Sequence, residues 1–538
     1  SNTENSKKYQ LVTKDKLLTH LYMEDNQCGF IVPKQAFFGR HYDDGLANRI
    51  IERLKIGDDK CAEVVLKLCN LSRSCGVIRV RKQDLDKKLK QLLEPKSDHD
   101  LETWFKEGLE IEESDKFGPG EVVDGKGSED ETQRHWWANE CPIFVAESFC
   151  SSMPVTATNR DESELYDGTL RVLFAMSRRR PRRAPGPSEP SDLEVEFCGG
   201  YWKLPKETRS SDNLQLSFIS DAKTKTATVQ PEDLHEVCAQ LSDSLQCLFG
   251  GESPTAKQLV RLAGKSGFDD QDLEKDLEAY FTAKLLMQGL PSPYSDSAFA
   301  SDSADLASAA TGRSKQVLSF IHRCRGCLEL KMAVKTKAKV LKAEEHQKKA
   351  LEHFERAVQV WPTNANALFF RGYAAFWWDD HCQRKPSLEA IKDLRRSRLL
   401  DPDFRQPLKN LGIAYIQLGQ YQKAIDVSKA FMKRHSSGSA LNLGAAYYHL
   451  ALELHRDLKL NARWLQTWDE DEKREDLVKT FADARFYLLM ASNEEAQAKE
   501  AELSSFSESE LGRFIHKAVQ SKGRATDLWE PPEPSLRP

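Results

Sequence analysis

Apolar residues recur at every third or fourth position through the carboxyl-terminal third of the chain, which is the spacing of one face of an α-helix. Between Met332 and Asn493 this pattern predicts a series of helices joined by short polar turns. In the middle of the chain, short apolar or alternating runs instead predict strands, which are Ile143–Phe149, Leu170–Met176, Leu193–Phe197, Leu214–Ile219 and Ala227–Val229. We therefore expect a mainly α protein, in which an α/β or α+β region with a small antiparallel sheet precedes an array of helices.

Small and aromatic residues hold the same places in successive units of this array. In first helices they are Gly372, Leu411, Gly412, Tyr415, Leu443, Gly444 and Tyr447, and in second helices Ala350, Phe354, Ala357, Ala390 and Ala424, with Pro362 and Pro402 closing two units. The pattern is similar to that of tetratricopeptide repeats, whose units of about 34 residues place Leu-Gly and Tyr in one helix and Ala, Phe and Pro in the next. The resemblance covers residues 330 to 495 and implies an α-solenoid, a superhelix of antiparallel helix pairs.

The resemblance also implies a ligand surface, because such arrays bind partners along the wall that the first helices build. Carried over position by position, the expected peptide-binding residues are Lys335, Lys339, Lys342, Asn366, Phe369, Tyr373, Phe376, Trp377, Lys409, Ile413 and Tyr448. Lysines beside aromatic side chains suit an acidic, partly apolar peptide, since lysines attract carboxylates and buried aromatics supply most of the binding energy. Two other interpretations stay open: the aromatic residues pack in the core, and the lysines line the solvated face of one long helix from Leu328 to Ala350.

The resemblance implies an adaptor or scaffold that binds a partner protein. Chaperone-binding members of the family grip a terminal carboxylate with Lys, Asn, Asn, Lys and Arg, and Lys335 alone matches that set. A chaperone-related partner is one candidate, and the alternative function is that of a co-chaperone or peptidyl-prolyl-isomerase-like enzyme targeted by the array. The sequence shows no isomerase motif, glycine-rich phosphate loop, HExxH helix or GxSxG turn, so it favours a binding protein over an enzyme.

Changes of composition predict the domain boundaries. Residues 1–107 are expected to form a mostly helical unit, with Val64, Val65 and Leu68 at core spacing, and residues 108–134 an acidic linker. Residues 135–288 are expected to form an α+β domain with a basic, proline-rich loop at 178–191, and 289–315 a linker rich in Ser, Ala and Asp. The repeat domain with a capping helix then spans 316–520, before a mobile tail at 521–538.

Charge and cysteine usage narrow the partners and the compartment. A net charge of -5 over 538 residues gives no overall field that would attract nucleic acid, and no apolar run has the length of a membrane span. The 12 cysteines lack the regular spacing of a secreted disulfide framework, which favours the cytoplasm, with the nucleus as an alternative because of the arginine-rich loop. Cys324 and Cys327 have metal-site spacing but no second pair, so neither a metal nor a cofactor is expected.

Overall fold

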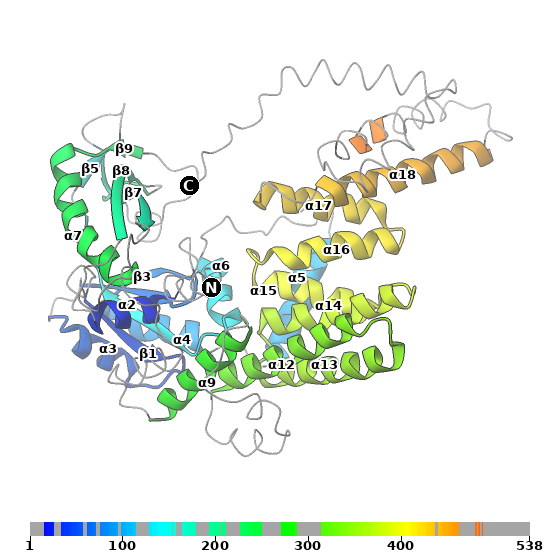
Figure 1. Cartoon of the computed structure of the whole chain (residues 1–538), viewed down its shortest axis with the longest axis horizontal. Coiled ribbons are helices and arrows are strands. Elements are labelled where there is room, and N and C mark those ends of the chain that lie inside the picture. The colour runs from blue at the N-terminus through cyan, green and yellow to red at the C-terminus, as the bar shows by residue number, and fades with distance from the viewer. Residues whose placement is uncertain are drawn as a thin grey trace, which may run out of the picture. The chain divides into compact units, whose positions relative to one another are not determined.

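The computed structural model describes residues 15–25, 34–57, 62–71, 76–94, 98–113, 129–152, 154–157, 164–178, 193–205, 207–210, 226–249, 271–287, 314–435, 440–461 and five residues between 479 and 487. This part of the chain is rich in helices, and its small antiparallel sheets all precede residue 230 (Figure 1). The expected mixed region followed by a helical region is thus confirmed.

The chain divides into two compact units. Unit 1 comprises residues 1–96, 124–335 and 352–367, and unit 2 comprises residues 97–123, 336–351 and 368–538. The boundary runs through two helices, α13 (Val340–Val360) and α14 (Ala365–His381). This division differs from the expected domains, because helix α5 (Asp98–Glu113) belongs with the helices of unit 2 and extends into the expected linker.

A four-stranded antiparallel sheet organises unit 1. Its strand order is β1 (Gln35–Gly39), β4 (Ile143–Ser148), β2 (Glu63–Leu68) and β3 (Ile78–Arg81). The side chains of β4 alternate between two cores: Ile143 and Val145 point into one, Phe144 and Ala146 into the other. Because both faces of this central strand are covered, its sequence is a continuous apolar run rather than an alternating one.

Helices supply the other half of each core. The Ile143 side contains residues of α2 (Lys16–Asp25), α9 (Gln271–Met287) and α12 (Lys315–Lys335). The Phe144 side contains residues of α3 (Leu46–Leu54), α4 (Leu85–Leu93) and α6 (Glu129–Ala138). Segments far apart in the sequence are therefore needed to bury one strand.

Two smaller sheets follow in unit 1. Strand β5 (Pro154–Thr156) pairs with β6 (Leu165–Asp167), and β7 (Thr169–Arg178), β8 (Leu193–Lys203) and β9 (Thr226–Thr228) form a three-stranded sheet. Helix α7 (Pro231–Phe249) packs against β8. The strands expected near residues 143, 170, 193 and 227 are confirmed, whereas the one expected at residues 214–219 lies outside the described residues.

A buried ion pair connects α12 with the loop before β4. The Arg323 guanidinium donates to both Glu140 carboxylate oxygens, at 2.6 and 3.0 Å. Asn364 Nδ2 donates to Glu140 at 3.0 Å and to Ser319 Oγ at 2.8 Å. The carboxylate is therefore held by one side chain of α12 and one from the turn before α14, as burial of a charge requires.

Unit 2 contains helices that pack in sequence order. They include α15 (Leu388–Leu400), α16 (Arg405–Gln417), α17 (Tyr421–His435) and α18 (Ala440–Asn461). Each packs on the next, and α16 also packs on α18. Their apolar faces share one core, in which Leu394, Leu411, Ala424 and Leu443 are almost fully buried.

In the described part of the chain, no helix has the length and hydropathy that crossing a membrane requires.

Two expectations about local structure are wrong. The expected helix around Val64 and Val65 is the strand β2, because a short β-branched apolar run fits a strand as well as a helix. The expected single helix from Leu328 to Ala350 is a helical hairpin, since α12 ends at Lys335 and α13 begins at Val340. Folding back lets α12 and α13 pack on each other, where one straight helix would leave both faces exposed.

Candidate peptide-binding surface

Helices α14 and α16 of unit 2 lie side by side and run in the same direction. Near their amino-terminal ends, the rings of Phe369 and Phe404 pack edge to face, with centroids 5.0 Å apart. Near their carboxyl-terminal ends, Gln417 Nε2 donates to Asp380 Oδ1 at 2.6 Å. Helices α14 and α16 are thus direct neighbours, joined through α15.

Helix α18 extends this layer beyond α16. Asn442 Nδ2 of α18 donates to the carbonyl oxygen of Lys409 on α16, at 3.1 Å. The ring of Tyr421, at the start of α17, stacks on His449 of α18 with centroids 5.6 Å apart. Helices α14, α16 and α18 therefore form one layer, and α15 and α17 connect its members.

The expected peptide-binding residues have different environments. Three of them are buried in the core of unit 2, namely Phe369, Phe376 and Tyr448. Three others are half-buried in unit 2, namely Tyr373, Trp377 and Ile413, and three are exposed there, namely Lys339, Lys342 and Lys409. The last two belong to unit 1, in which Lys335 is exposed and Asn366 is half-buried. Asn366 Nδ2 lies 3.4 Å from a carboxylate oxygen of Glu140. The interpretation that some of the aromatic residues pack in the core is therefore right for Phe369 and Phe376 of α14, and Tyr448 of α18 is buried in the same core.

Two pairs of half-buried apolar side chains on α14 and α16 lie one helical turn apart. Tyr373 and Trp377 are one turn apart on α14, and Ile413 and Ile416 are one turn apart on α16, so each pair shares one side of its helix. Tyr373 stacks on Phe369, with 12° between the ring planes. We call Tyr373, Trp377, Ile413 and Ile416 the α14–α16 stripe.

A lysine and a histidine lie next to the residues of this stripe. Lys409 precedes Ile413 by one turn on α16 and is exposed. Trp377 stacks on His381, with ring planes 3° apart and centroids at 5.6 Å. The stripe thus offers fixed aromatic and aliphatic surface beside a cation, which are the groups that bind an apolar side chain next to a carboxylate.

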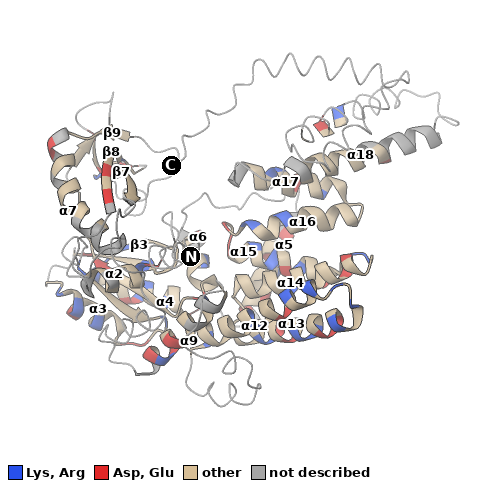
Figure 2. Cartoon of the chain, viewed as in Figure 1, with Lys and Arg blue, Asp and Glu red and all other residues tan. Residues whose placement is uncertain are grey.

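The three lysines expected on the first helix of the array lie elsewhere. Lys335 ends α12, Lys339 lies in the turn after it, and Lys342 is in the first turn of α13, the second helix of the hairpin. Figure 2 shows charged residues of both signs along α13. These lysines fit the alternative interpretation of a solvated helix face, although one helix was expected and two are present.

Helix α5, which packs on α15, lies partly in the expected helical unit at 1–107 and partly in the expected linker at 108–134, and its contact with α15 was not predicted. Arg395 Nη2 donates to the carbonyl oxygen of Leu109 at 2.9 Å, and the Arg396 guanidinium lies 4.8 Å from the ring centroid of Phe105. A pocket of about 610 Å³ opens between the two helices. Apolar residues recur at every fourth position from Leu101, which is the signal for a helix, but from residue 108 the acidic composition suggested a linker.

The cysteines of α12 are buried in the protein core. Burial raises the pKa of the Cys324 thiol to about 12 and also raises that of Cys327, so both stay protonated at neutral pH. A protonated thiol is a poor metal ligand. Both cysteine side chains therefore pack in the core.

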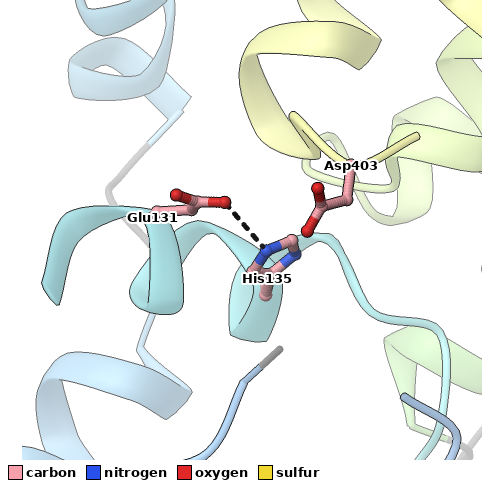
Figure 3. Close-up of side chains that lie close together, drawn as sticks. All are labelled: Glu131, His135 and Asp403. Atoms are coloured by element: carbon pink, nitrogen blue, oxygen red, sulfur yellow. Dashed lines mark ion pairs between the residues drawn. The ribbon is translucent and has the colours of Figure 1, made fainter. Parts of the chain in front are cut away.

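Helix α6 carries a buried pair of metal-ligating residue types. His135 Nε2 lies 3.7 Å from Glu131 Oε1, one turn away on the same helix (Figure 3). Asp403, drawn in the same figure, belongs to unit 2, whereas Glu131 and His135 belong to unit 1. Two ligand atoms are fewer than a protein zinc site uses, so the pair by itself is not assigned as a metal site.

Comparison with known proteins adds no family to this description. No protein-family model matches the chain, and no curated protein is similar to it at a significant level.

Proposed function

We propose that this chain is a protein-interaction adaptor of the tetratricopeptide-repeat kind. In this proposal α14, α16 and α18 are first helices of successive pairs, stacked as an α-solenoid, and together they bind a peptide of a partner protein. The α14–α16 stripe carries the proposal, because it leaves aromatic and aliphatic side chains half-exposed on adjacent helices. Buried clusters of this composition are where binding energy concentrates in protein interfaces.

The ligand class follows from the side chains around the stripe. Tyr373 and Trp377 suit a large apolar side chain, since an aromatic ring supplies much contact area and loses little conformational entropy. Lys409 suits a carboxylate next to that side chain. The bound segment is therefore acidic and partly apolar, and its charge is read mainly by α16 rather than by the lysines near residue 340.

Selection from a random peptide library tests this proposal without assuming a partner. Peptides displayed on phage are selected on the immobilised full chain, and a synthetic consensus peptide is titrated by fluorescence polarisation. We expect a consensus with a large apolar residue beside Asp or Glu. Replacing Tyr373 and Trp377 together by Ala should weaken binding at least about tenfold, and Lys409→Glu about threefold or more.

A matched control separates the stripe from general surface effects. Leu341 on α13 is 82% exposed and apolar, so Leu341→Ala removes exposed apolar surface away from α14, α16 and α18. This variant should bind the consensus peptide like the wild type. The proposal fails if no consensus emerges, or if the stripe variant melts like the wild type and still binds the peptide with unchanged affinity.

A further inference from the structure

Helix α5 is an acidic amphipathic helix. Seven of its 16 residues are Asp or Glu, and it has a single lysine. Leu101, Phe105 and Leu109 recur at intervals of four, which places them on one side of the helix. Leu101 and Phe105 are 3% and 2% exposed, so this side is packed as tightly as a protein core.

The surface that covers α5 is one side of α15. While Leu394 of α15 packs in the core of unit 2, Arg395 and Arg396 contact α5. Arg396 pairs with Glu102, and its guanidinium lies over the ring of Phe105. One arginine thus reads an acidic residue and an aromatic residue of α5 at the same time.

Besides these charge contacts, the backbone of α5 packs closely on α15. A Cβ atom on Gly108 would lie 3.2 Å from a methyl carbon of Leu399 on α15, so α5 approaches α15 closely at its one glycine. Arg395 holds the same part of α5 through the carbonyl oxygen of Leu109. The contact therefore selects a helix with a small residue between its second and third apolar positions.

Helix α5 does not use all of the binding groups of α15. The pocket of about 610 Å³ between the helices is lined by Lys392 and Leu388, among other residues. Leu388 is 79% exposed. Lys392 is exposed and forms no hydrogen bond or ion pair within the described residues. A cation and an apolar side chain thus remain free for a ligand larger or more acidic than α5.

We propose that this side of α15 is a docking surface for acidic amphipathic helices, and that α5 is a resident occupant which a partner helix of the same pattern displaces. The partner carries apolar residues at three positions spaced by four, a carboxylate after the first and a small residue before the third. Because α5 is part of the same chain, its effective concentration at α15 is on the order of millimolar, and the partner must compete with it. This surface is separate from the α14–α16 stripe.

A labelled peptide that copies residues 98–113 tests the proposal with the full chain. Its binding is followed by fluorescence polarisation against the wild type and against Phe105→Ser, which weakens the resident helix. We expect at least tenfold tighter binding to Phe105→Ser. Adding Arg396→Glu should reverse this gain, and a peptide with Glu102→Arg should restore it. Lys348→Glu, an exposed charge reversal on α13, is the matched control and should change nothing.

Two results would overturn the proposal. One is equal binding of the peptide to the wild type and to Phe105→Ser. If Phe105→Ser fails to fold, Glu102→Arg in the full chain replaces it and must bind the peptide more tightly than the wild type by the same factor. The other is an Arg396→Glu effect that is equal for both peptides, since that would mean a general change of charge. The variant lacking Tyr373 and Trp377 should bind this peptide normally, so failure here is distinct from failure of the proposed function.

Discussion

Gly372→Ala is the substitution that most directly probes how the helices of unit 2 pair. A Cβ atom at this position would lie 2.8 Å from the carbonyl oxygen of Ala390 and 3.1 Å from Asp393 Cβ, both on α15. A backbone oxygen cannot rotate away, so α14 and α15 must move apart. Overpacking of this kind costs about 1–3 kcal/mol, while alanine favours a helix over glycine by about 1 kcal/mol. We expect a net loss of about 2 kcal/mol, towards the upper end of that balance.

Thermal and denaturant unfolding of the full chain measure this loss. A change of this size lowers the melting temperature by about 4–8 °C for a unit of this size. Gly412→Ala is the matched control on the next first helix. Its added Cβ would meet Ser428 Oγ at 3.2 Å and Asn442 Nδ2 at 3.5 Å, which are side-chain atoms that can adjust. This variant should stay within about 1 kcal/mol of the wild type.

Comparing the stabilities of Gly372→Ala and Gly412→Ala tests whether α14 and α15 pack closely at Gly372. If Gly372→Ala is as stable as Gly412→Ala, or more stable than the wild type, helix propensity alone governs both positions. Helices α14 and α15 would then lack the close contact that requires glycine, and the repeated Gly positions of the sequence would have no packing role.

Three further predictions concern charge and capping. Burial, then His353 and then nearby arginines lower the pKa of His322 from 6.5 to about 4, so the neutral imidazole is favoured in the folded state. The contribution of neutral His322 to the free energy of unfolding should be fully present above pH 6.5 and be lost as the pH drops towards 4. In His322→Gln the denaturant midpoint should therefore decline less between pH 7.5 and 5. An unchanged decline would contradict this prediction. Arg323→Leu should cost about 3–5 kcal/mol because Glu140 stays buried without its partner, and adding Glu140→Gln should recover part of the loss in urea unfolding. Ser387→Ala removes the capping hydrogen bond of α15 and should cost about 1 kcal/mol, whereas an equally large loss for Ser387→Asp would exclude capping as the cause.

Repeating sequence signals located the helices from α14 onward correctly. Gly412 stands where α16 meets α17 and α18, as expected for a small residue at a helix contact. The strands β4 and β8 were found because their apolar runs are short and bounded by polar or turn residues. Local pattern therefore sufficed where an element is long, or where its boundaries are marked in the sequence.

Tertiary contacts decided the rest. Helix α14 continues to His381, and the stacking of Trp377 on His381 lies inside its last turn. Nothing in the sequence marks the turn after Lys335, where the chain folds back. The docking of α5 joins residues about 290 positions apart, a separation that no local pattern encodes. For the candidate site, the sequence indicated the α14 and α16 residues but could not separate Tyr373 from its buried neighbours.

Hydrogen exchange read by mass spectrometry, with and without a saturating consensus peptide, is the most direct test of the proposed function. We expect exchange to slow in α14 and α16, at residues 365–381 and 405–417, and this protection to be lost in the variant lacking Tyr373 and Trp377. Protection confined to unit 1, or protection that persists in that variant, would contradict peptide binding by the first helices.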